Sequence, residues 1–386
     1  MSAEAKISTQ ISENFKALIN TCINYNIPFV AYSLPQQVNA VTLVQFNSFP
    51  RRIEIESHLE ERKGFIIAPF NENNDSCTYL IEPDITLNSK DVNKEIIQHL
   101  STINRFRNKQ NISKNASYIA TQEEFEQNVT KIKDAIKNGL AEKVVLSRLH
   151  LEECLNNIDV AEIFLDINTS YPDAFRYIFK MPDTDCWIGA SPEPLLLVNG
   201  NMAETVSLAA TKKMNGTPID KIVWNSKEMQ EQNYVTKYIE NLLVDFGIKD
   251  FKENGPSSQK AGQLVHLKSV FNFNSEQFFN SPGKFINTLH PTPSVCGIPK
   301  KASIHLLKKM EKHNREYYTG FLGPLNMNNQ TNLFVNIRCM KKQGNIFVLY
   351  QGAGITEGSD PTSEWNETQQ KMMTMLSVLR KHFSGK

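Results

Sequence analysis

Three charged residues near the C-terminal end of the chain are spaced to share one face of a helix. Glu364, Glu367 and Lys371 stand at positions i, i+3 and i+7. The run Gly352-Ala353-Gly354 before them predicts a turn, because glycines let backbone N–H groups approach an anion closely. Two carboxylates and an ammonium beside such a turn suit a metal ion and a carboxylate substrate. A solvated helix with a surface Glu–Lys pair explains the same spacing and is the commoner case.

Two further residues, Lys143 and Glu193, are candidates for proton transfer. Lys143 opens the strand-like run EKVVLSRL, directly after a helix that we expect to end at Gly139. A lysine there is usually solvated, but burial in a closed site favours the neutral amine, which can act as a base. Prolines on both sides of Glu193, in SPEP, favour extended backbone and can aim its carboxylate rigidly. A polar turn between two strands explains the same sequence and, taken by itself, is the preferred interpretation.

Four more side chains could hold a ligand. Thr211 in AATKK offers a hydroxyl, and Glu231 lies on a predicted amphipathic helix, where it could equally be surface charge. His290 opens the proline-rich loop HPTPSVCGIP, which either packs against a ligand or forms a structural turn. Arg338 lies inside a predicted strand, Asn332–Met340, and a buried guanidinium there requires an anionic partner.

The elements that must position these residues alternate between helix and strand patterns. Thr121 and Glu124 predict a capping box at the start of a helix, and Thr362 or Ser363 is expected to cap the C-terminal helix. The polar, basic segment Asn104–Asn115 is expected to be a linker. Apolar periodicity predicts helices at Ile11–Tyr25, Ser226–Leu243 and Ala302–Asn314, and strands at Phe29–Tyr32, Ala40–Phe46, Gly64–Ala68, Asp173–Phe179, Trp187–Ala190, Leu195–Val198, Thr205–Leu208, Leu264–Phe273 and Ile346–Tyr350.

Composition narrows the class of protein. The net charge of +1 argues against a nucleic-acid partner or a membrane surface. The polar N-terminal stretch lacks an apolar signal segment, and no apolar run reaches transmembrane length. The 6 cysteines are scattered without a C-x-x-C pair, which indicates reduced thiols in a cytoplasmic protein rather than disulfides or a zinc site.

The order of the motifs along the chain resembles the chorismate-utilising enzymes, a family that includes isochorismate, salicylate, anthranilate and aminodeoxychorismate synthases. The motifs are, in order, EKVVLSR, IGASPEPLL, SLAATKK, SKEMQEQNYV, LHPTPSVCGIP, YYTGFLG, FVNIRCM and YQGAGITEGSDPTSEWNETQQKM. The similarity is closest to isochorismate synthase, because HPTP and Lys143 match that branch. The amine-adding members usually carry a P-x-G-T-like loop and typically no lysine at the position of Lys143.

The resemblance implies an α+β fold, in which large, mostly antiparallel β-sheets are flanked by helices. It covers residues 116–386, which we expect to form the chorismate-binding catalytic core. Residues 1–115 look like the variable N-terminal part of the same fold. We expect the two parts to form one compact domain together.

The resemblance also implies a reaction and roles for the candidate residues. Lys143, neutral in the working state, would activate water to attack C2 of chorismate, and Glu193 would protonate the departing C4 hydroxyl. Mg²⁺ is the implied cofactor, with Glu231 and Glu367 as ligands and Glu364 as a ligand or close partner of one. The implied substrate-binding set is Thr211, His290, Arg338, Gly352, Ala353, Gly354 and Lys371, with Arg338 and the glycine run on the enolpyruvyl carboxylate.

Three functions are consistent with this family. The first is a Mg²⁺-dependent isochorismate synthase, in menaquinone or siderophore synthesis. The second is a salicylate synthase, which also eliminates pyruvate. The third is an inactive chorismate-binding protein, against which the joint presence of Lys143, Glu193, Glu231 and Glu367 argues. We expect chorismate as the small-molecule substrate, no glutaminase subunit, and a monomer.

Two positions depart from the family pattern. The usual L-A-G-T is Leu208-Ala209-Ala210-Thr211 here, and Ala210 adds a Cβ where the backbone often approaches substrate. The usual Glu-His pair is Glu231-Gln232, which removes a histidine beside the expected metal ligand.

Overall fold

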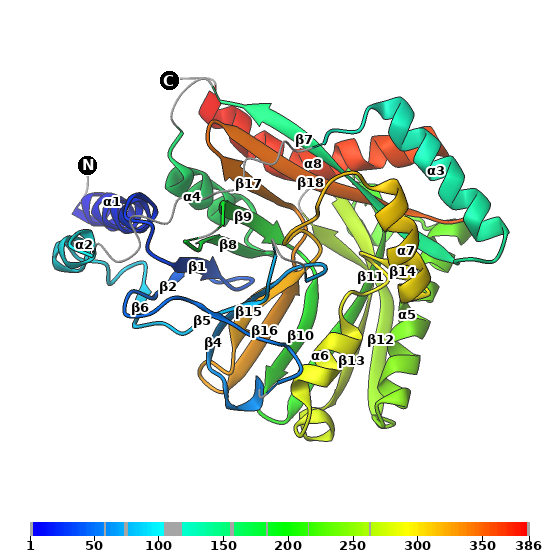
Figure 1. The fold of residues 1–386 in the computed structure, drawn as a ribbon, viewed down its shortest axis with the longest axis horizontal. Helices are drawn as coiled ribbons and strands as arrows, with labels where there is room; N and C mark the ends of the chain where they lie inside the picture. Colours follow the sequence, from blue (N-terminus) through cyan, green and yellow to red (C-terminus); the bar gives the residue numbers. More distant parts are fainter. Residues whose placement is uncertain are drawn as a thin grey trace.

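Two nine-stranded β-sheets dominate the computed structural model, which describes residues 3–57, 59–72, 76–103, 118–154, 158–182, 184–214, 216–261 and 264–383. The first sheet has the order β14-β7-β18-β17-β9-β8-β1-β2-β6, and the second has the order β12-β13-β11-β10-β16-β15-β4-β5-β3. Neighbouring strands pair antiparallel in both sheets (Figure 1). With the helices around the sheets, this arrangement confirms the predicted α+β class.

Groups of consecutive strands belong in turn to the first and to the second sheet. The first sheet contains β1 (Phe29–Ser33), β2 (Val41–Val44), β6 (Ile85–Asn88), β7 (Lys143–Glu153), β8 (Phe175–Lys180), β9 (Cys186–Ser191), β14 (Gly297–Ile298), β17 (Cys339–Gln343) and β18 (Ile346–Ile355). The second contains β3 (Arg51–Arg52), β4 (Gly64–Ala68), β5 (Tyr79–Ile81), β10 (Pro194–Asn199), β11 (Met202–Lys213), β12 (Phe251–Ala261), β13 (Leu264–Asn274), β15 (Phe321–Leu325) and β16 (Gln330–Val335).

Among the described residues, the helices include the five predicted ones and three that were not predicted, at residues 94–101, 160–170 and 282–289. The helices are α1 (Ala3–Asn24), α2 (Lys94–Ser101), α3 (Gln122–Lys137), α4 (Val160–Ser170), α5 (Ser226–Asp245), α6 (Pro282–Leu289), α7 (Lys300–Met310) and α8 (Pro361–Phe383). No helix among the residues described is long and apolar enough to cross a membrane.

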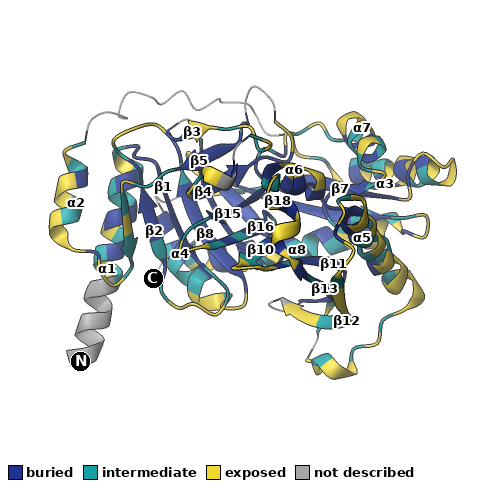
Figure 2. Cartoon of the chain, turned by 90° about the horizontal axis from the view of Figure 1, so that it is seen from below, coloured by how far each residue is buried: buried dark blue, intermediate teal, exposed yellow. Residues whose placement is uncertain are grey.

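The sheets pack face to face, and helices cover their outer faces. Phe175 of β8 and Phe334 of β16 stack between the sheets, with ring centroids 4.3 Å apart. Helices α1, α2, α4 and α8 pack on the outer face of the first sheet, and α5 and α6 pack on the outer face of the second. Most strands are therefore buried, whereas β12 and β3 are largely exposed, and the other exposed residues lie mainly on the helices and loops (Figure 2).

Strand periodicity explains how one strand can serve two layers. In β4, Phe65 and Ile67 belong to the core between the sheets, whereas Ile66 and Ala68 belong to the core beneath the helices. Successive side chains of a strand point to opposite faces, so a fully apolar strand fits a sheet that is covered on both sides.

The N-terminal elements extend both sheets. Strand β1 pairs with β8 in the first sheet, and β4 pairs with β15 in the second. The strands before residue 103 therefore share their sheets with strands after residue 118. The predicted linker Asn104–Asn115 lies outside the described residues.

The helix caps were predicted with mixed success. The capping box of α3 is confirmed, because the Glu124 N–H donates to Thr121 Oγ1 and the Thr121 N–H donates to Glu124 Oε2. The predicted cap of α8 is wrong: the Ser363 N–H donates to Asp360 Oδ1 at 2.8 Å, so Asp360 is the cap. Pro361 then takes the first helical position, where a missing N–H costs nothing.

The predicted strand around Arg338 is two strands. Strand β16 ends at Val335 in the second sheet, and β17 begins at Cys339 in the first. Arg338 lies in the crossing segment between the sheets with φ of 53°, a left-handed conformation that is uncommon for a residue with a long side chain. The local apolar pattern suits either one long strand or two short ones, so it did not reveal the crossing.

The predicted turn at Gly352-Ala353-Gly354 is also wrong. Strand β18 continues through these residues to Ile355 and pairs with β7, with Gly352 opposite Ser147 and Gly354 opposite Val145. The glycines are required by space rather than by a turn. A Cβ at Gly354 would lie 2.8 Å from Glu231 Oε1, and a Cβ at Gly352 would lie 3.0 Å from the Tyr318 hydroxyl. Strand β12 was not predicted, because its sequence FKENGPSSQKA is polar.

Candidate active site

A small cavity of about 70 Å³ collects most of the predicted site residues. Its walls come from distant segments of both sheets and from two helices, α5 and α8. Eight predicted residues line it: Lys143, Glu193, Thr211, Glu231, Arg338, Gly352, Gly354 and Lys371. The fold therefore gathers side chains that lie up to 228 positions apart in the chain, from Lys143 to Lys371.

Four predicted residues do not line the cavity. Ala353 faces the opposite side of β18 and packs in the core with α3 and α7. His290 is buried beside Phe321 and borders a separate cavity of about 310 Å³. Glu364 and Glu367 lie on α8, near the cavity but outside its lining.

Lys143 and Glu231 form a buried ion pair at one end of the cavity. Lys143 Nζ lies 3.0 Å from Glu231 Oε1, and only 2% of the lysine side chain is exposed. Burial raises the pKa of the Glu231 carboxyl, but the charge and hydrogen bond of Lys143 outweigh burial and lower that pKa overall. Glu231 is therefore ionised, and the close packing of Gly354 against both side chains fixes their positions.

Glu193 differs in its protonation from Glu231, the other carboxylate that lines this cavity. It lies between β9 and β10, where its backbone C=O accepts from the Val335 N–H. Burial raises the pKa of Glu193 to about 7, despite opposing effects of Ser294, Lys143 and other cations. A carboxyl with a pKa near neutrality can donate a proton at physiological pH, as a general acid must.

The acidic residues of α8 each pair with a lysine. Glu364 Oε1 lies 3.1 Å from Lys227 Nζ, and Glu367 Oε1 lies 2.6 Å from Lys371 Nζ. Burial and the neighbouring Glu367 raise the pKa of Glu364 to about 7. Lys371 also donates to the Gly352 carbonyl at 3.0 Å, which ties α8 to β18.

The donor set is suited to a hard divalent cation, although it is not gathered around one point. Across the described part of the chain, no three His, Cys, Asp or Glu side chains lie close enough together to hold a metal ion. Glu231, Glu364 and Glu367 offer the carboxylate oxygens that Mg²⁺ prefers. The raised pKa of Glu364 results from its burial and then from the nearby charge of the half-buried Glu367, a repulsion that a cation would relieve.

Arg338 is held in place by His266, a residue that the sequence did not single out. Arg338 Nη2 donates to His266 Nε2 at 3.3 Å, while His266 Nδ1 donates to the Ala210 carbonyl at 2.8 Å. Burial lowers the pKa of His266 to about 3, so the ring is neutral. Arg338 Nη1 is buried without a hydrogen-bond partner among the described residues, and is thus available to a substrate carboxylate.

Ala210 adopts a left-handed conformation, with φ of 55°, in the bulge where the register of β11 against β13 shifts. This conformation favours glycine, the residue usual in the family motif. It also directs the Ala210 carbonyl to His266. The second departure, Gln232, is buried and donates to Ser207 Oγ at 2.8 Å, so it joins α5 to β11.

Four residues of the site were missed from the sequence: His266, Ser294, Lys227 and Tyr318. Ser294 lies in the loop that the sequence did single out, but His290 was chosen there instead. His266 stands in the strand sequence LVHLKSV, where one polar residue among apolar neighbours was the available signal.

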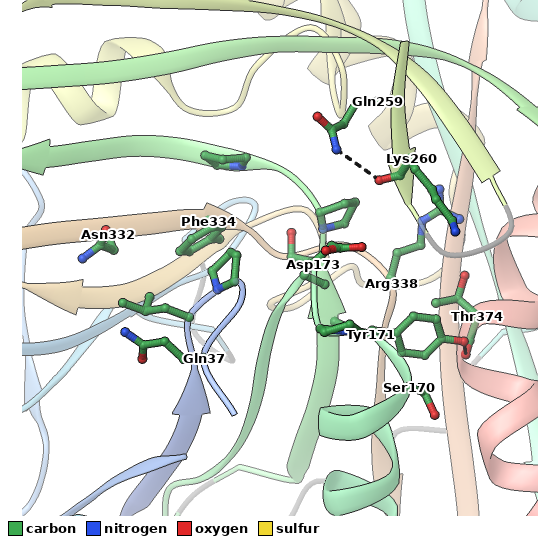
Figure 3. A pocket seen from close by; sticks show the side chains of 18 of the residues that line it. Gln37, Ser170, Tyr171, Asp173, Gln259, Lys260, Asn332, Phe334, Arg338 and Thr374 are labelled. Atoms are coloured by element: carbon green, nitrogen blue, oxygen red, sulfur yellow. Dashed lines mark hydrogen bonds between the residues drawn. The ribbon is translucent and has the colours of Figure 1, made fainter. Parts of the chain in front are cut away.

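A larger groove of about 920 Å³ adjoins the cavity at Arg338, which lines both. Figure 3 shows Arg338 among the side chains of this groove, with Tyr171, Lys260 and Thr374. Lys143, Glu193 and Glu231 line the small cavity instead. We therefore place the chemistry in the small cavity despite its size, which is below the roughly 300–1,000 Å³ typical of ligand pockets.

Comparison with known proteins supports the same family. The sequence model described as "Chorismate binding enzyme" matches residues 3–380. The chain belongs to this family. Its relatives include isochorismate synthase EntC of Escherichia coli K12, which is 27% identical over 270 residues that span 68% of this chain and 69% of the relative. Anthranilate synthase component 1 of Acetivibrio thermocellus is 25% identical over 350 residues, covering 86% of this chain and 68% of the relative.

Solved structures share the fold of this chorismate-binding enzyme. A crystal structure described as a putative 2,3-dihydroxybenzoate-specific isochorismate synthase, DhbC of Bacillus anthracis, has a TM-score of 0.76 at 20% identity and covers 96% of this chain and 99% of its own. The menaquinone-specific isochorismate synthase MenF of Escherichia coli has a TM-score of 0.71 at 19% identity, covering 95% and 91%. At these identities the likeness establishes the fold.

Proposed function

We propose that this chorismate-binding enzyme isomerises chorismate to isochorismate. The observation that supports the proposal best is the pairing of a lysine and a protonatable carboxyl in one cavity. Lys143 opens β7 and Glu193 lies between β9 and β10, both are at least 97% buried, and Lys143 lies close enough to influence the ionisation of Glu193. Water addition at C2 and departure of the C4 hydroxyl need one base and one acid, and this pair can supply both.

In the proposed reaction, Lys143 as the neutral amine takes a proton from the attacking water. Glu193 gives its proton to the oxygen that leaves C4, and the ring double bonds shift between the two carbons. Burial raises the pKa of Glu193 to about 7, which supports the protonated carboxyl that this step needs. General acid–base groups of this kind contribute roughly 10²–10⁴-fold each.

Arg338 and Lys371 are proposed to hold the substrate carboxylates. The free Nη1 of Arg338 can donate to the enolpyruvyl carboxylate, and its Nη2 stays fixed by His266. Lys371 lies beside the Gly352 carbonyl at the cavity wall, where it can meet a second anionic group. Thr211 adds a hydroxyl to the same wall.

Mg²⁺ is the proposed cofactor, with Glu231, Glu364 and Glu367 as the residues that would hold it. When bound, the ion would neutralise the ring carboxylate of the substrate. Each of these carboxylates forms an ion pair with a lysine in this structure, so Mg²⁺ binding requires these ion pairs to break. The reaction adds water rather than ammonia, so it requires no glutaminase subunit.

Product analysis tests the proposal directly. Purified protein is incubated with chorismate and Mg²⁺, and the products are separated by chromatography. Isochorismate alone is expected. Salicylate together with pyruvate would support the salicylate synthase instead, and chorismate that binds without any product would indicate an inactive binding protein. When Glu193→Gln is assayed in the same way, the Glu142→Gln variant, changed at an exposed position, serves as its control.

A further inference from the structure

The loop between α6 and β14 brings a hydroxyl group to the proposed acid. Ser294 Oγ donates to Glu193 Oε1 at 2.5 Å, across 101 positions of sequence. Both residues line the small cavity, and Glu193 is 97% buried. A hydroxyl so close to a buried carboxyl affects both its orientation and its charge.

A second hydroxyl, from Thr292, extends this hydrogen bond into a chain of two. Thr292 Oγ1 lies 2.5 Å from Ser294 Oγ, and Thr292 is buried. The Ser294 hydroxyl has a single hydrogen, and it donates this hydrogen to Glu193 Oε1. The Ser294 oxygen then accepts from the Thr292 hydroxyl. The donations therefore run from Thr292 to Ser294 and on to Glu193.

We infer that Ser294 is a positioning residue for Glu193. By donating to Oε1 of Glu193, Ser294 keeps the transferable proton of that carboxyl on Oε2. The inference rests on the proposed function, because that function makes Glu193 the acid. During the transfer, the Oε2–H bond breaks, the proton goes to the oxygen leaving C4, and the electron pair stays on the carboxylate. The hydrogen bond from Ser294 then strengthens, since bonds to a charged acceptor are roughly twice as strong as neutral ones.

The surroundings of Glu193 show why Ser294 matters among several cations. Lys143 from β7, Lys371 from α8 and Arg338 from the crossing segment all act on its carboxyl. Burial raises the pKa of Glu193 to about 7, and Ser294 is the strongest influence in the opposite direction, ahead of each cation. Ser294 thus keeps Glu193 acidic enough to release its proton, while burial keeps it protonated beforehand.

The decisive experiment measures the protonation of the Glu193 carboxyl as a function of pH, without substrate. The carboxyl band is followed by infrared difference spectroscopy against pH and is assigned with Glu193→Gln. Ser294→Ala is expected to raise the titration midpoint by about one pH unit, because a hydrogen bond to the ionised form is lost. Thr292→Val is expected to shift the midpoint in the same direction by less. Ser294→Thr, which retains the hydroxyl, and Ser281→Ala, whose serine makes no capping hydrogen bond, are expected to leave it unchanged.

The rate profile provides the second readout. Activity requires protonated Glu193, so the rate falls as the pH rises through its pKa, and this limb is expected to move upward in Ser294→Ala by the same amount. A midpoint that does not move in Ser294→Ala or Thr292→Val would overturn the inference. If no variant and no wild-type protein converts chorismate, the proposed function fails, whereas the infrared titration still decides whether Ser294 controls Glu193.

Discussion

The buried Glu193 carboxyl makes a quantitative prediction about stability. Burial raises its pKa from an ordinary value of 4.5 to about 7 in the folded protein. The protonated group therefore contributes stability that is fully present below about pH 4.5 and is lost as the pH rises through about 7. Glu193→Gln cannot ionise, keeps an oxygen to accept from Ser294, and is expected to lack this loss.

The size of the effect follows from the two pKa values. One unit of pKa shift corresponds to about 1.4 kcal/mol, so the full shift of about 2.5 units is worth roughly 3 kcal/mol at high pH. Between about pH 5.5 and about pH 8.5, the stability advantage of Glu193→Gln over the wild type should grow by about 2 kcal/mol. Glu364 also has a raised pKa, but it is present in both proteins and cancels in the difference.

The assay is urea-induced unfolding at both pH values, without Mg²⁺ or chorismate. The exposed Glu142→Gln variant is the matched control and should follow the wild type at both pH values. An equal difference between Glu193→Gln and wild type at the two pH values would refute the reasoning, because it would mean that Glu193 titrates as a solvated carboxyl.

The remaining predictions concern the ligands of the cavity. Lys143→Ala is expected to lose roughly 10²–10⁴-fold in turnover while chorismate binding, measured by calorimetry, is largely kept; near-wild-type isochorismate formation would exclude Lys143 as the base. Arg338→Ala is expected to weaken chorismate binding by about 2–4 kcal/mol in the same titration, since the substrate carboxylate loses a buried cationic partner. Unchanged affinity would show that the role of Arg338 is structural. Glu367→Gln is expected to weaken Mg²⁺ binding in a calorimetric titration of the protein alone and to lower the pKa of Glu364, because one repelling charge is gone; full activity at low Mg²⁺ would argue against Glu367 as a ligand.

The sequence alone determined several local elements, including some that carry candidate site residues. The capping box of α3, the helix that carries Glu231 and the strand that begins with Lys143 all follow from short patterns. Helix caps and strand alternation involve neighbours within a few residues, so the sequence expresses them directly. The ordered motifs also sufficed to indicate the family, which the match to residues 3–380 bears out.

Only the tertiary structure decided how these side chains meet. Arg338 was predicted inside one strand, but the chain crosses between the sheets there. The glycines at 352 and 354 were predicted to form a turn, but β18 continues through them and packs against Lys143, Glu231 and Tyr318. The apolar pattern does not distinguish one strand from two, or a turn from a continuing strand, because strands covered on both faces lack alternation.

The contact between Ser294 and Glu193 illustrates the physical reason. Within one loop, the sequence favoured His290, whereas the fold places His290 against Phe321 and Ser294 against the proposed acid. Which residue of a loop reaches a carboxyl 101 positions away depends on how both sheets pair and on what space remains between them. Such pairings are set by the burial of the whole core, so the residues near Glu193 that control its proton emerge only when the chain is folded.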